Sequence, residues 1–131
     1  MHVVLAVSDV DRAYDFYRQV FGWEHHLAWE GEYVELVVSD TDRLGLYVRD
    51  GYSETAGAEP VELNGHVSPA YLYVRVENLD ELIERLLEAG ARPLSPRSER
   101  GWGDEAAYFA DPDGNVIGVG QYIHAPTVDG K

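Results

Sequence analysis

The stretch HVVLAVSDVDRAYDFYRQVFGWE (residues 2–24) recurs in outline as YLYVRVENLDELIERLLEAGARP (residues 71–93). Each copy begins with an apolar run typical of a β-strand, and then passes Asp9 or Asn78, residues that cap helix N-termini. Apolar residues at helical spacing follow in both copies. In the second copy, Glu81 stands three residues after Asn78, as in a capping box. The repeat therefore predicts two copies of one strand–helix unit.

Each predicted helix runs to a glycine, Gly22 or Gly90, the residue that most often ends a helix. Short strand-like segments follow both helices. In the first copy they are residues 24–29, 32–38 and 43–49, and in the second 91–95, 106–110 and 115–121. The chain therefore reads as β-α-β-β-β twice, an α+β fold with one module over about 1–49 and the other over about 68–121. Residues 50–67 form the predicted connection, and 122–131 the tail.

Composition favours one packed domain that is neither secreted nor membrane-bound. A chain of 131 residues with 45% apolar residues can bury a core. No run approaches the ~20 apolar residues that span a bilayer, and the N-terminus lacks the basic region of a signal peptide. Cysteine is absent, which excludes disulfides and thiol nucleophiles. We expect a cytoplasmic protein.

The formal net charge is −14, from 24 acidic and 10 basic residues. Such a surface repels phosphate backbones, which disfavours nucleic-acid binding. It attracts cationic small molecules over long distances. An acidic surface also keeps a protein soluble, so the charge alone does not identify a ligand.

The duplicated module, the opening VSDVDRAYDFYRQVFGWE (residues 7–24) and the closing YFADPDGNVIGV (residues 108–119) resemble the vicinal oxygen chelate superfamily. This superfamily groups glyoxalase I, extradiol dioxygenases, fosfomycin resistance enzymes and bleomycin resistance proteins. The resemblance covers residues 2–121. It implies the glyoxalase/bleomycin resistance fold, in which each module curls its mixed sheet into an open cup. It also implies a site enclosed by two modules, and a homodimer.

In enzymes of this superfamily, four symmetric strand positions hold a divalent metal that polarises substrate oxygens. The resemblance places these positions on His2, Tyr71, Gly45 and Gly118, and strand alternation independently points His2, Gly45 and Gly118 into the cups. Only His2 is a good metal ligand, and one histidine does not make a tight site. Glu35 is the nearby carboxylate that could join it. We expect no catalytic metal and no cofactor.

The other histidines show no ligand spacing; they are His25, His26, His66 and His124. Adjacent residues of a strand point to opposite faces, so His25 and His26 cannot bind the same metal.

Aromatic and small residues take the remaining cup-facing positions. The glycines at 45, 118 and 120 predict a roomy floor in each cup, and Trp102, between two glycines, is free to lie over a ligand. Tyrosines are also ordinary strand residues, and Phe109 and Trp23 read as core. The predicted ligand-binding residues are Trp102, Tyr71, Tyr73, Tyr47, Tyr33, Tyr108, Trp29, Glu35 and His2.

The segment RGWGDEAAYFADPDGN (residues 100–115) most resembles the bleomycin resistance branch. That resemblance implies a metal-free protein that sequesters an aromatic or cationic natural-product antibiotic without changing it. Two alternatives stay open. One is a metal-dependent lyase, transferase or dioxygenase that uses His2 and Glu35. The other is a metal-free enzyme acting on a natural-product intermediate, with Tyr71 or Glu35 as acid or base.

Overall fold

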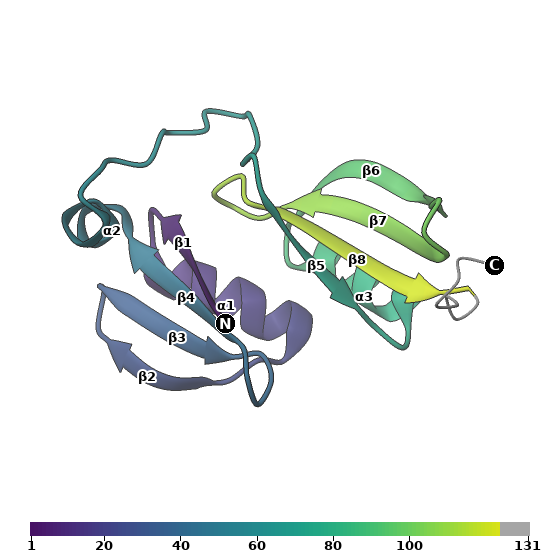
Figure 1. Ribbon diagram of the computed structural model, residues 1–131, viewed down its shortest axis with the longest axis horizontal. Coiled ribbons are helices and arrows are strands. Elements are labelled where there is room, and N and C mark those ends of the chain that lie inside the picture. Colours follow the sequence, from purple (N-terminus) through teal and green to yellow (C-terminus); the bar gives the residue numbers. More distant parts are fainter. Residues whose placement is uncertain (124–131) are drawn as a thin grey trace. The chain divides into compact units, whose positions relative to one another are not determined.

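The computed structural model describes residues 1–123, so His124 and the rest of the predicted tail beyond Ile123 lie outside the described residues. The chain divides into two compact units, residues 1–64 and 65–131 (Figure 1). No helix among residues 1–123 has the length and apolar character needed to cross a membrane. Homodimerisation stays a prediction.

The first unit is one four-stranded mixed sheet with two helices. Its elements are β1 (His2–Val7), α1 (Val10–Phe21), β2 (His25–Trp29), β3 (Tyr33–Val37), β4 (Arg43–Val48) and α2 (Arg49–Ala56). The strand order is β1-β4-β3-β2, with β1 parallel to β4 and the other pairs antiparallel.

The second unit repeats the strand arrangement of the first, with one helix within residues 65–123 (Figure 1). Its elements are β5 (Tyr71–Arg75), α3 (Leu79–Glu88), β6 (Arg92–Glu99), β7 (Asp104–Ala110) and β8 (Val116–Tyr122). The order is β5-β8-β7-β6, and β5 is parallel to β8. The duplicated β-α-β-β-β module and the α+β class are confirmed, as two sheets that do not close.

The helix ends follow the capping residues of the repeat. The Asp9 carboxylate accepts a backbone N–H three residues on, and the Asn78 side chain does the same from Glu81 at 3.1 Å. Gly22 ends α1 with φ 73°, a left-handed conformation that glycine adopts without strain. Gly90, with φ 86°, follows the last turn of α3.

Each sheet buries one face under its helix, as strand alternation requires. In the first unit Leu44 and Leu46 are buried while α1 packs on β4. In the second, Ile117 and Val119 are fully buried, with α3 against β8. The intervening residues Gly45 and Gly118 therefore point to the opposite face, as predicted.

Two elements differ from the sequence prediction. The predicted connection begins with helix α2 instead of a loop, because Gly51 lets this helix pack closely on β4. The weak segment 91–95 is a longer strand, β6, at the edge of its sheet. An edge strand tolerates Pro93 and Pro96, since one side of its backbone has no partner strand.

Candidate functional site

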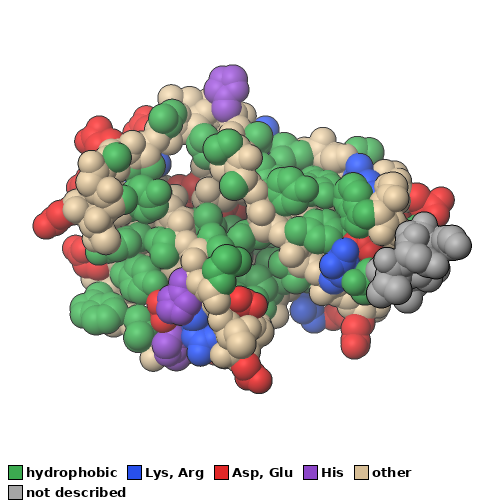
Figure 2. Space-filling model, viewed as in Figure 1, with side chains coloured by type: hydrophobic (Ala, Val, Ile, Leu, Met, Phe, Trp, Pro, Cys, Tyr) green, Lys and Arg blue, Asp and Glu red, His purple; other side chains and the backbone are tan. Residues whose placement is uncertain are grey.

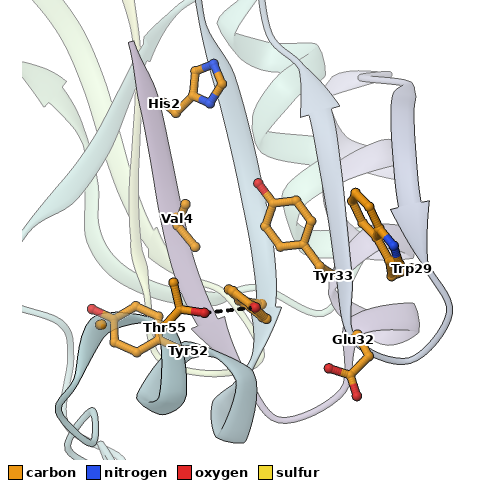
Figure 3. Close-up of a pocket in the computed structure, with 9 residues that line it drawn as sticks. His2, Val4, Trp29, Glu32, Tyr33, Tyr52 and Thr55 are labelled. Atoms are coloured by element: carbon orange, nitrogen blue, oxygen red, sulfur yellow. Dashed lines mark hydrogen bonds between the residues drawn. The ribbon is translucent and has the colours of Figure 1, made fainter.

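A pocket of about 930 Å³ opens on the face of the first sheet that α1 leaves uncovered. It lies between the strands and helix α2 (Figure 3). Its walls are aromatic, apart from small residues and one carboxylate at the rim. The lining residues are His2, Val4, Trp29, Glu32, Tyr33, Tyr47, Tyr52, Thr55 and Ala56.

The prediction of a roomy floor above the glycines is wrong. A Cβ on Gly45 would lie 2.5 Å from the Tyr33 hydroxyl, and a Cβ on Gly118 would lie 2.6 Å from Tyr108 and 2.7 Å from Tyr73. The chain's own tyrosine rings occupy this space. These glycines therefore permit aromatic side chains to lie flat on the sheet, and leave no room there for a ligand.

A single residue explains why space remains in the first unit. Val4 stands opposite Gly45 in the register of β1 and β4, and Tyr73 stands opposite Gly118 in the register of β5 and β8. Valine is too short to fill the cup, whereas the ring of Tyr73 contacts both Gly118 and Gly120. The pocket therefore depends on Val4, which strand alternation places in the cup.

Helix α2 closes one side of the pocket. The backbone at Gly51 approaches the Tyr47 ring so closely that a Cβ there would lie 2.2 Å from the ring. A hydrogen bond of 3.0 Å joins the hydroxyls of Tyr47 and Thr55, drawn as the dashed line in Figure 3. The sequence did not indicate that Tyr52 and Thr55 belong to the site, because their segment resembles a turn-rich connection.

Glu35 is the charged centre beneath the pocket, with only 8% of its surface exposed. Its carboxylate accepts hydrogen bonds from the Tyr33 hydroxyl at 2.8 Å and from His26 Nε2 at 2.5 Å. His2 Nδ1 lies 3.5 Å away. Burial alone raises the pKa of Glu35, but the hydrogen bonds from Tyr33 and His26 and the nearby imidazoles outweigh it, so the pKa is lowered.

The same contacts keep Tyr33 a neutral phenol. Burial, and then the hydrogen bond to Glu35, raise the pKa of Tyr33 well above its usual range. Sequence reasoning joined Glu35 to His2 and overlooked His26. The two adjacent histidines do point to opposite faces, since His25 Nδ1 lies 3.0 Å from the Tyr14 hydroxyl.

Because its pKa is lowered on folding, Glu35 contributes stability above the ordinary glutamate pKa, about 4.3. That contribution is lost as the pH falls through the folded-state value. We expect Glu35→Gln to lower the free energy of unfolding at pH 7, and its difference from wild type to shrink below about pH 4. Urea unfolding at a series of pH values measures this, with Glu88→Gln on an exposed helix position as control. A difference independent of pH would contradict the role of Glu35.

The positions of the superfamily's metal ligands do not fit a metal here. They carry His2, Tyr71, Gly45 and Gly118, which offer one imidazole, one phenol and no carboxylate. Within residues 1–123, no group of three or more His, Cys, Asp or Glu side chains is arranged to hold a metal ion. Glu35 reaches His2, but its hydrogen bonds already go to Tyr33 and His26.

The other predicted residues lie in the second unit, on the face opposite α3. Tyr71 is 55% exposed and Trp102 is 47% exposed. Trp102 Nε1 and the Tyr73 hydroxyl both donate to Oδ2 of the fully buried Asp104, at 3.2 and 2.5 Å. Burial, and then a hydrogen bond to Tyr71, raise the pKa of Tyr108 to about 12. Figure 2 shows hydrophobic side chains over the strands of both units.

The predicted residues thus form two sets. His2, Trp29, Tyr33 and Tyr47 line the pocket of the first unit, above Glu35. Tyr71, Tyr73, Tyr108 and Trp102 form an aromatic face in the second unit. Phe109 is buried in the core as expected, whereas Trp23 is only half-buried and stacks on Phe21, with ring centroids 4.2 Å apart.

Comparisons with known proteins agree with this architecture. The family model for the glyoxalase/bleomycin resistance protein/dioxygenase superfamily matches residues 1–119. Glutathione transferase FosA from Serratia marcescens is 30% identical over 88% of this chain and 75% of its own length. Protein YraH from Bacillus subtilis is 26% identical, over 91% and 94%. A glyoxalase-related enzyme from Fulvimarina pelagi has a similar structure, with TM-score 0.81 and 23% identity over 99% of this chain and 93% of its own.

Proposed function

Because the chain belongs to the glyoxalase/bleomycin resistance protein/dioxygenase superfamily, we propose that it is a metal-free drug-binding protein. It sequesters an aromatic, cationic natural-product antibiotic in the pocket of the first unit and confers resistance without modifying the drug. The observation that carries this proposal is a pocket walled by four aromatic rings with a carboxylate at its rim.

The size and lining of the pocket support a ligand, or a part of a larger ligand, that carries a planar group. Its volume of about 930 Å³ is at the upper end of the range for drug-sized molecules. Trp29, Tyr33, Tyr47 and Tyr52 offer ring faces and edges on which a planar aromatic or a cation packs favourably.

The charges support a cationic group on that ligand. Glu32 is exposed at the rim, and the net charge of −14 adds a long-range attraction for cations. Two phenols of the pocket are held in hydrogen bonds, since Tyr33 donates to Glu35 and Tyr47 is hydrogen-bonded to Thr55. These contacts favour binding over chemistry.

The test is a binding screen of bleomycin-type glycopeptides and polycyclic aromatic cations, in which tryptophan fluorescence reports binding. We expect one ligand per pocket, quenched emission and unchanged ligand on release. Trp29→Phe removes most of the quenching, whereas Trp23→Phe, outside the pocket lining, preserves it. Recovery of a chemically altered ligand would refute the proposal.

The rim carboxylate gives a second readout in the same screen. Glu32→Gln weakens binding of a cationic ligand several-fold and reduces the salt dependence of its affinity. Glu88→Gln, on the exposed surface of the second unit, leaves both unchanged. Equal losses for a cationic ligand and its neutral analogue would argue against charge recognition at the rim.

A second candidate function is an enzyme of the same superfamily, favoured by the similarity to glutathione transferase FosA. A metal-dependent form would need ligands beyond His2 and Glu35. Purified protein that contains stoichiometric Ni, Zn, Mn or Fe, or that adds glutathione to an electrophile, would establish this alternative. Unchanged ligand and metal-free protein would support sequestration.

A further inference from the structure

We propose that the second unit carries an anion-binding site in which Arg75 receives the carboxylate of a planar aromatic acid. The site consists of residues of this unit alone. It is therefore independent of the pocket in the first unit, and either proposal can fail without the other.

Arg75 is fixed at its inner nitrogen. Nε donates to Oδ2 of Asp104 at 3.0 Å, and the Asp104 side chain is fully buried. A buried carboxylate at the base of the guanidinium restrains its position and plane, because a charge-assisted hydrogen bond has a strict geometry. Asp104 thereby acts as a positioning residue.

Two rings restrain the guanidinium further. Its central carbon lies 4.7 Å from the centre of the Tyr122 ring and 5.6 Å from that of Tyr73. Stacking on aromatic faces favours guanidinium over ammonium, since the guanidinium is planar and weakly hydrated. The orientation of the Arg75 side chain is thus set before any ligand arrives, which lowers the entropic cost of binding.

The outer nitrogens of Arg75 donate no hydrogen bond to any residue that the structure describes. Among residues 1–123, its only hydrogen bond uses Nε, and its side chain is 46% exposed. Other arginines of the same unit differ: Arg97 pairs with Asp80 and Glu105, and Arg100 donates to several oxygens of its own hairpin. The two NH₂ groups of Arg75 present the fork that matches the two oxygens of a carboxylate.

An aromatic platform lies next to this fork. Trp102 Nε1 donates to the same oxygen of Asp104 that holds Arg75, and the indole is half-exposed. Tyr71 lies on the same face of β5 as Arg75, by strand alternation, and is also exposed. A carboxylate attached directly to a flat ring can therefore bind Arg75 while its ring packs on Trp102.

Because the protein surface is acidic, an anion must contact both the Arg75 guanidinium and the aromatic platform in order to bind. A net charge of −14 repels a free anion, and Asp104 offsets the charge of Arg75. A small inorganic anion gains only the fork, whereas an aromatic acid gains the fork and the ring contact. The chemistry selects planar aromatic carboxylates over phosphate.

The test titrates full-length ¹⁵N-labelled protein with 2-naphthoate and follows the three tryptophan indole signals by NMR. We expect the Trp102 signal to shift in a saturable manner. The neutral analogue 2-naphthamide binds about tenfold more weakly, and inorganic phosphate does not shift the Trp102 signal. Equal affinity for acid and amide, no shift with the acid, or shifts confined to Trp29 would overturn the proposal.

Variants locate the anion contact. Arg75→Gln weakens 2-naphthoate about tenfold without changing 2-naphthamide, and Arg75→Lys also weakens the acid, because an ammonium lacks the fork. Arg92→Gln, which removes an exposed arginine elsewhere in the unit, is the matched control. Thermal unfolding verifies that each variant is folded. Retained binding of 2-naphthoate by folded Arg75→Gln or Arg75→Lys would refute the assignment.

Discussion

Gly118→Val is expected to lower the free energy of unfolding by about 3 kcal/mol, because the side chain enters space that two tyrosine rings already fill. A Cβ alone would lie 2.6 Å from Tyr108 and 2.7 Å from Tyr73. Both rings are constrained: Tyr73 donates to buried Asp104, and Tyr108 lies beneath the guanidinium of Arg100. Neither ring moves without losing these contacts. Urea denaturation followed by circular dichroism measures the loss.

Gly101→Val is the matched control, since a Cβ at that position meets open space and its backbone needs no left-handed conformation. It should change stability by less than about 0.5 kcal/mol. Tyr108→Ala opens room beside Gly118, so the cost of Gly118→Val should fall in that background. Additive effects of the two substitutions would show that the Tyr108 ring does not occupy the space above Gly118.

Gly51→Val is expected to displace helix α2 and abolish most ligand binding in the first unit. The backbone of this helix contacts the Tyr47 ring, and a Cβ would lie 2.2 Å from it. The extra volume costs about 2 kcal/mol of stability and separates Thr55 from the Tyr47 hydroxyl, its partner at 3.0 Å. The affinity for the ligand found in the binding screen should fall by more than tenfold, because one wall of the pocket moves.

Fluorescence titration at the Trp29 signal measures this affinity, and urea denaturation measures the stability. Thr55→Val tests the same wall more gently, since it removes the hydrogen bond to Tyr47 and keeps the size of the side chain. Wild-type affinity in Gly51→Val would mean that α2 takes no part in binding. Aromatic binding to the second unit serves as an internal control, because Gly51 lies in the first.

Most of the fold was predictable because it follows from local rules. Asp9 and Asn78 begin the helices, Gly22 and Gly90 follow their last turns, and period-two alternation gives the buried face of each strand. Helix α2 was not predictable in this way. Its sequence contains a glycine and several turn-forming residues, and it is held by packing on β4.

The candidate site was predictable only in part. Strand alternation correctly predicted that Tyr33, Tyr47 and His2 share one face of the sheet and that Glu35 lies near His2. Strand alternation could not predict the contact between His26 and Glu35, because that contact depends on the irregular register between β2 and β3. It also could not identify Asp104, whose partners Tyr73 and Arg75 come from a strand about thirty residues earlier.

The sequence by itself determined the duplicated module, the family and the absence of a carboxylate at the two late-strand positions. Only the tertiary structure decided what lies above Gly45 and Gly118. A glycine in the sequence shows that a side chain is absent at that position. The atoms that fill the space belong to residues of neighbouring strands, which the sequence does not identify. Their positions depend on register and on the sizes of residues such as Val4 and Tyr73. This is why a pocket remains beside Val4 in the first unit, while Tyr73 fills the space above Gly118 and Gly120 in the second.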